Sequence, residues 1–253
     1  MKLFSKTLAA SLCVAAFTFS APQAFADTVN LTNVGTWPSP AMGAVEENVM
    51  RTPGGSLDPM WVGGFNVVIN SVTGSTPFAV GQHILAWCLE VAEHFPSGST
   101  SDYNVVQEPS VVDGWVDSIK RLYTMYGASV NNAVTSAAMQ LAIWEVVSGD
   151  TTYNLSDGGF QAEGVSGDAS SAGAVSTAQT WLNGLAANPT AWNDGYKLVK
   201  LEYAGTDKPP LQDLVTFIPT PLPGAALMFL SALGLGGLAR RRKQKADPGA
   251  LAA

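Results

Sequence analysis

Two short apolar stretches with basic neighbours, one near each end of the 253-residue chain, delimit the part that can fold as a globular unit. The N-terminal stretch, residues 8–19, follows Lys2 and Lys6 and precedes Ala24-Phe25-Ala26. This order is typical of a secretory signal peptide over residues 1–26, with cleavage after Ala26, and the run is too short to cross a membrane. Residues 27–217 remain as one exported unit, long enough for a single sizeable core.

The C-terminal stretch combines a proline motif, an apolar segment and a basic cluster. Pro221, Leu222, Pro223 and Gly224 precede the apolar residues 225–239. The basic cluster, residues 240–245, holds Arg240, Arg241, Arg242, Lys243 and Lys245. The apolar segment predicts a short membrane helix, and the basic cluster should stay on the cytoplasmic side, which leaves the bulk of the chain outside.

Residues 218–245 resemble the PEP-CTERM sorting signal, in which a proline motif, a short apolar helix and arginines follow one another. This chain has Leu222 where the name-giving motif has glutamate. The resemblance implies recognition by an exosortase-type sorting enzyme in a Gram-negative bacterium. It also implies transient anchoring in the inner membrane, removal of the tail, and delivery to the cell surface or to the extracellular matrix of a biofilm.

The exported part is acidic. Residues 27–217 hold six of the 13 Lys and Arg residues but 19 of the 20 Asp and Glu residues. An acidic surface argues against nucleic acid or anionic lipid as the partner. The two histidines, His83 and His94, show no paired ligand spacing, so we expect no metal site and no cofactor.

The order of expected elements is strands, then helices, then a strand. Residues 28–60 predict loops and short edge strands, whereas residues 60–72 and 78–92 predict strands. Apolar spacing predicts helices between Pro109 and Gly127, over 132–148 and over 174–187, and residues 197–203 predict a returning strand. This order favours an α+β fold with segregated layers.

The exported part has a single cysteine, because Cys13 lies within the signal peptide and only Cys88 remains. In an extended strand Trp87 shares one face with Leu85 and Leu89, and Cys88 lies on the opposite, more mixed face beside Glu90. A lone thiol outside the cytoplasm is open to oxidation and crosslinking. We therefore expect Cys88 to be buried or chemically engaged.

The helix predicted over 132–148 carries one polar side chain on its apolar stripe, Gln140. A buried amide without partners costs roughly 1–3 kcal/mol. The Cys88 thiolate could attack the amide carbon of Gln140, expel ammonia and leave a thioester, which would remove both the free thiol and the buried amide. Burial under Trp87 and Trp144 would slow hydrolysis of this bond.

Two short motifs resemble those of the surface thioester domains of bacterial adhesins, also described by a Thr-Gln-x-Ala motif. The first is Trp87-Cys88-Leu89-Glu90, and the second is residues 139–144, Met-Gln-Leu-Ala-Ile-Trp, with Met139 in place of Thr. The resemblance implies a β-sandwich or barrel-like sheet with a helical lobe, covering about residues 60–205. It also implies a Cys88–Gln140 thioester that covalently captures an amine of a protein, or a hydroxyl of a matrix polysaccharide.

Glu90, Glu145 and His94 are candidate supporting residues, because a carboxylate or an imidazole near the thiol could move a proton. On this interpretation the protein is a single-use adhesive or crosslinking protein rather than an enzyme. Two alternatives stay open. Cys88 could be the nucleophile of a hydrolase, with His94 or His83 as base and Gln140 as an oxyanion donor, or it could be an inert buried thiol in a passive matrix protein.

Overall fold

The computed structural model describes residues 27–36, 44–108, 114–149, 152–191, 195–206 and 210–220. The predicted signal peptide and the sorting motif, with Pro221, Leu222, Pro223, Gly224 and Arg240–Arg242, lie outside these ranges. The predicted membrane helix at 225–239 lies outside them too. Within the described ranges, no helix is long and apolar enough to cross a membrane.

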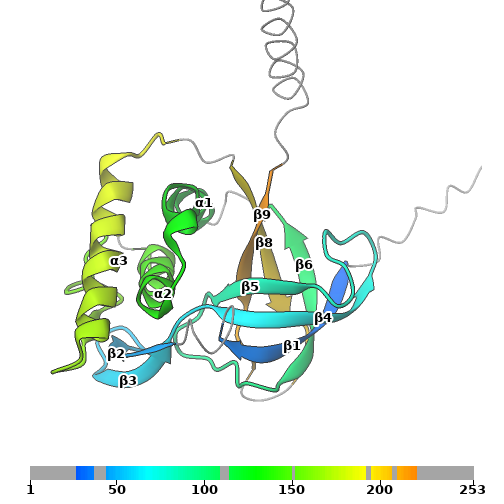
Figure 1. The fold of residues 1–253 in the computed structure, drawn as a ribbon, viewed down its shortest axis with the longest axis horizontal. Helices are drawn as coiled ribbons and strands as arrows, with labels where there is room; N and C mark the ends of the chain where they lie inside the picture. The colour runs from blue at the N-terminus through cyan, green and yellow to red at the C-terminus, as the bar shows by residue number, and fades with distance from the viewer. Residues whose placement is uncertain are drawn as a thin grey trace, which may run out of the picture.

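Six antiparallel strands close into a barrel, seen on the right of Figure 1. Around the barrel the strands are β1 (Thr28–Thr36), β4 (Phe65–Thr73), β5 (His83–Cys88), β9 (Leu214–Pro219), β8 (Tyr196–Tyr203) and β6 (Thr100–Gln107), and β6 pairs again with β1. Closure leaves no free strand edge among these six strands. On β5 the alternating side chains Ile84, Ala86 and Cys88 are all buried.

Three helices and a small sheet form a second lobe beside the barrel, seen on the left of Figure 1. The helices are α1 (Trp115–Tyr126), α2 (Ala133–Val147) and α3 (Ala169–Ala187). The sheet has the order β3 (Leu57–Val62), β2 (Val45–Met50) and β7 (Ala162–Gly164). The short 3₁₀ turn η1 (Gly127–Ser129) follows α1.

Helix α2 is the central element of the lobe. Every residue from Ser136 to Val146 is buried, as expected for a helix that is apolar on all sides. Its start is fixed by a capping box, in which the Asn132 side chain accepts from the Thr135 N–H at 2.9 Å and the Thr135 side chain bonds the Asn132 main chain. Gln140 is held in the middle of this rigid helix.

Strand β5 is covered on both faces. Trp87 points toward the lobe and packs edge-on against Tyr123 of α1 and Phe217 of β9, with ring centroids 5.4 and 5.7 Å apart. Gly64 lies against the side chains of Leu85 and Trp87 on β5. A Cβ at position 64 would be only 2.6 Å from a Leu85 methyl carbon. The Gly64 N–H donates to Ser136 Oγ of α2 at 2.8 Å, which joins the two lobes.

The expected α+β class is confirmed, and the sheet beside the helical lobe is a closed barrel. All three predicted helices are present, although α3 starts five residues earlier than expected, because Asp168 accepts from the main-chain N–H groups of Ser170 and Ser171. The prediction of only short edge strands before residue 60 was wrong, since β1 is a nine-residue barrel strand. Strands β6 and β9 were not predicted at all.

Candidate functional site

Cys88 is the last residue of β5, and its main chain is clamped by Gln140. The Cys88 N–H donates to Gln140 Oε1 at 2.9 Å, and Gln140 Nε2 donates to the Cys88 carbonyl oxygen at 2.8 Å. Both residues are only 1% exposed. The predicted meeting of these two residues is therefore present, but both ends of the Gln140 amide are engaged with the main chain of Cys88.

The sulfur of Cys88 contacts a different glutamine, Gln212. The thiol donates to Gln212 Oε1, and Gln212 Nε2 donates to the main-chain oxygens of Glu90, at 2.6 Å, and Glu93. Gln212 is 3% exposed. The side-chain amide that contacts the thiol therefore belongs to Gln212 and not to Gln140, the predicted acyl partner.

Gln212 reaches the thiol because β5 and β9 are neighbours in the barrel. Cys88 pairs with Leu214, and the Leu89 N–H donates to the Asp213 carbonyl oxygen at 3.0 Å, so the chain just before β9 lies beside the chain just after β5. The sequence analysis missed Gln212 because it did not predict β9. The sequence feature that could have identified Gln212 is the stretch 211–215, Leu-Gln-Asp-Leu-Val, in which a single glutamine precedes an apolar strand.

Carboxyl groups surround the thiol. Burial raises the pKa of Cys88 well above its usual value, and the nearby Glu90 raises it further. Burial and the charge of Asp213 raise the pKa of Glu90 to about 7. The Glu90 carboxylate accepts from the Asp213 N–H at 2.8 Å. Glu90 can therefore exchange a proton near neutral pH beside a thiol that is protonated at that pH.

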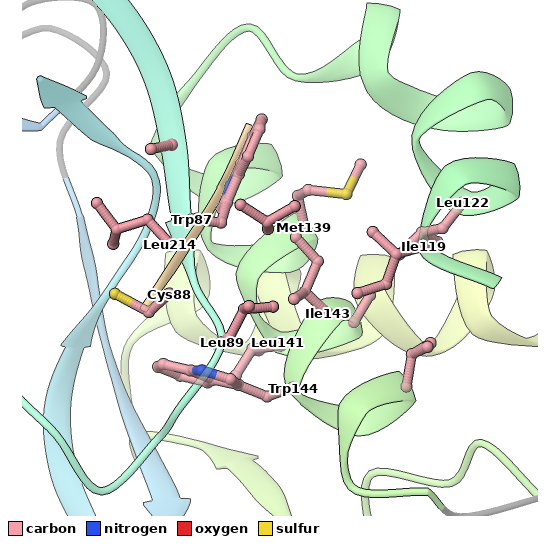
Figure 2. Packing of buried hydrophobic residues seen from close by; sticks show 14 of the residues in the cluster. Trp87, Cys88, Leu89, Ile119, Leu122, Met139, Leu141, Ile143, Trp144 and Leu214 are labelled. Carbon is pink, nitrogen blue, oxygen red and sulfur yellow. The ribbon is translucent and has the colours of Figure 1, made fainter. Parts of the chain in front are cut away.

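A cavity of about 580 Å³ opens over Cys88, Gln140 and Gln212. Its wall is largely apolar, and the apolar lining residues are Met60, Trp61, Phe65, Phe95, Pro96 and Trp144. Trp144 is 5% exposed, and its indole N–H has no hydrogen-bond partner in the described part of the chain. Figure 2 shows the Trp144 ring beneath the segment that carries Cys88 and Leu89.

The other predicted supporting residues divide into those at the cavity and those away from it. His94 lines the cavity, and its Nε2 accepts from an Arg51 guanidinium nitrogen 3.0 Å away. Glu145 is not in the lining; it is buried in the lobe, where its Oε1 accepts from the Asn154 N–H at 2.7 Å. Trp87 supports β5 from the lobe side and does not line the cavity either.

The two histidines proposed as bases have hydrogen-bond partners other than the Cys88 thiol. His83 stands at the opposite end of β5 from Cys88, about 17 Å away for a six-residue strand. There it bonds Asn66. Because Arg51 only donates, the His94 nitrogen that faces it must be the acceptor, and no hydrogen bond joins either histidine to the thiol within the described residues.

No family model and no curated protein matches the sequence. Two solved structures are similar to the fold. One is the N-terminal thioester domain of a protein F2 like fibronectin-binding protein from Streptococcus pneumoniae, with 15% identity, a TM-score of 0.43, and coverage of 74% of this chain and 100% of that chain. The other is the N-terminal thioester domain of a surface protein from Clostridium perfringens, with 13% identity, a TM-score of 0.40, and coverage of 76% and 99%.

Proposed function

We propose that Cys88 and Gln212 form an internal thioester, and that this bond acylates an amine on a partner molecule. The observation that carries the proposal is the contact between the Cys88 thiol and the side-chain amide of Gln212 in a buried site. The thioester is a stored electrophile that reacts once per molecule, so the protein is an adhesive or crosslinking protein and not a turnover enzyme.

Formation of the bond needs one proton acceptor, and Glu90 supplies it. The Glu90 carboxylate takes the thiol proton, Sγ attacks Cδ of Gln212, and the C–N bond of the amide breaks. The nitrogen leaves as ammonia and takes the proton back from Glu90. Thiol and amide have then become thioester and ammonia, with no oxidant or cofactor needed.

Capture of a partner runs through the same carbon. The amine nitrogen attacks Cδ of Gln212, the C–S bond breaks, and the released sulfur takes up the proton that the amine loses. The product is an amide that joins Gln212 to the partner, with Cys88 again a thiol. A hydroxyl on a polysaccharide would give an ester by the same route, and the carboxyl groups around the site favour a cationic amine over a neutral hydroxyl.

Gln140 has a positioning role in this scheme. Its amide satisfies the two main-chain groups of Cys88 that the end of β5 would leave unpaired. This fixes the orientation of the Cα–Cβ bond and holds the sulfur against Gln212. In this scheme the amide of Gln140 stays intact, whereas that of Gln212 is consumed.

The sequences of the two terminal segments support a site of action outside the cell. We propose that residues 1–26 direct export, and that the tail at 218–245, with its 225–239 helix, anchors the protein in the membrane until an exosortase-type enzyme processes it. The cell surface or the extracellular matrix would then be the site of capture, where a partner protein or matrix polymer offers the nucleophile.

The test is the intact mass of residues 27–220, which keep β9 whole, prepared without amine buffers. The wild-type protein should be lighter than its calculated mass by one ammonia, and methylamine should add to it. Cys88→Ala and Gln212→Ala should both show the full mass and bind no methylamine, whereas Gln140→Ala should still lose ammonia. Retained ammonia loss in Gln212→Ala, together with its absence in Gln140→Ala, would instead make Gln140 the acyl partner.

A further inference from the structure

The cavity over Cys88 and Gln212 is larger than the attacking group requires. At about 580 Å³ it has the size of a site for a drug-sized molecule. A lysine side chain, an unbranched chain ending in an amine, fills only part of such a space. The remainder is walled mainly by aromatic and other apolar side chains, so water left there would gain few hydrogen bonds.

Two features of the cavity wall indicate what kind of ligand it can bind. Trp61, on β3, lines the cavity and is 69% exposed, the highest exposure among the large hydrophobic residues of the described chain. An exposed tryptophan beside an apolar cavity is typical of an interaction site rather than of a core. Trp144, also in the wall, is 5% exposed and adds its ring to the apolar lining.

The charges around the cavity select the same kind of ligand. Glu93 lines the cavity, whereas the Asp213 carboxylate, next to Gln212 in sequence, is paired with Lys200 Nζ at 3.1 Å. The Glu90 carboxylate accepts from the Asp213 N–H. Arg51 also lies at the rim, where its guanidinium bonds the Ala92 carbonyl oxygen and His94. An incoming ammonium would therefore meet the Glu93 carboxylate in the cavity wall, beside the apolar residues that line most of the rest.

From these observations we propose that the cavity binds a lysine together with an apolar or aromatic residue next to it in an extended partner segment. The amine reaches Gln212, and the neighbouring side chain packs between Trp61 and the other apolar lining residues. This inference rests on the proposed thioester and adds the partner's local sequence to it. Trp61 is the residue that determines specificity for the side chain next to the lysine.

The experiment compares three amines on the wild-type protein and on Trp61→Ala. The amines are methylamine, a short blocked peptide with Phe next to its single Lys, and the same peptide with Gly in place of Phe. Adduct formation is followed by intact mass. The wild type should react about tenfold faster with the Phe peptide than with the Gly peptide, which corresponds to about 1.4 kcal/mol of selectivity.

In Trp61→Ala this preference should fall to less than about threefold. Val80→Ala is the matched control, because Val80 is 64% exposed and does not line the cavity. It should keep the full preference.

Equal rates for the two peptides on the wild type would overturn the inference about the partner's sequence. The proposed thioester itself would not be contradicted by that result. A loss of methylamine reactivity in Trp61→Ala equal to the loss of peptide reactivity would also overturn the inference, because Trp61 would then act on the bond. An ester adduct with a β-linked oligosaccharide, formed faster than the Phe-peptide adduct, would make the aromatic wall a sugar site. Failure of every amine on the wild type would reject the proposed function first.

Discussion

The two glutamines that contact Cys88 come from different halves of the molecule and differ in what they bind. Gln212 belongs to the barrel, at the entry to β9, and its amide meets the sulfur. Gln140 belongs to the helical lobe and bonds only the main chain of Cys88 in the contacts described here. A barrel alone would hold thiol and amide side by side, whereas the lobe fixes the strand end and covers the site.

The largest expected effect comes from opening the bond within the barrel. A thioester between residues separated by 124 positions would act as a crosslink that restricts the unfolded chain. By the loop-closure argument used for disulfides it stabilises by about 3–5 kcal/mol. Methylamine treatment should therefore lower the free energy of unfolding by that amount, measured by chemical denaturation.

Cys88→Ala provides the control for this prediction. It should have the lower stability from the start and should not respond to methylamine. A wild-type unfolding curve that does not shift although an adduct has formed would show that the crosslink does not stabilise the fold.

The next prediction compares how much each of the two glutamines contributes to the free energy of unfolding. In the Cys88→Ala background, where no bond can form, Gln140→Ala should cost about 2–4 kcal/mol, because two buried main-chain groups lose their partners. Gln212→Ala in the same background should cost less than about 2 kcal/mol, since the carbonyl groups it leaves belong to Glu90 and Glu93, half-buried residues that water can reach. Equal losses would remove the distinction between a positioning glutamine and a reacting one.

Each half of the molecule also holds a carboxyl group with a raised pKa, and we expect different consequences. Burial raises the pKa of Glu47, on β2 of the lobe, to about 7, and Asp168 adds to the shift. The Ser171 hydroxyl donates to Glu47 Oε2 at 2.6 Å and opposes it. The folded state thus favours the protonated form, so stability should fall as the pH rises from about 4.5 through 7.

Glu47→Gln should remove this loss. At pH 8 the variant should be about 1–3 kcal/mol more stable than wild type, and at pH 4 the two should be close. The pH dependence of thioester formation should not change, because that depends on Glu90. Glu163→Gln, on the neighbouring β7, is the exposed control, and a gain as large as that of Glu47→Gln would point to net charge instead of burial.

The smallest effect tests how firmly the lobe holds Gln140. Asn132→Ala removes the side chain that accepts from the Thr135 N–H at the start of α2 and should cost about 1 kcal/mol in thermal or chemical unfolding. The fraction of molecules that have lost ammonia should stay at the wild-type value. A reduced fraction would mean that the alignment of α2 controls the chemistry more tightly than the Gln140 hydrogen bonds require.

Much of the architecture followed from local patterns. The apolar spacing and the caps gave all three helices, because helix formation depends on contacts three and four residues apart. The single cysteine, and the single polar residue on the stripe of α2, identified Cys88 and Gln140 as residues that needed an explanation. The meeting of these two residues across 52 positions is present in the fold.

The sequence alone determined which residue types were available: one thiol within residues 27–217, an excess of acidic residues there, and lone glutamines in apolar surroundings. Only the tertiary structure decided which glutamine faces the sulfur. That choice depends on the pairing of β5 with β9, strands far apart in the chain whose register no local pattern specifies. The main chain of Cys88 bonds Gln140, and its thiol contacts Gln212. The direction of each group is fixed only when the barrel closes against the helical lobe.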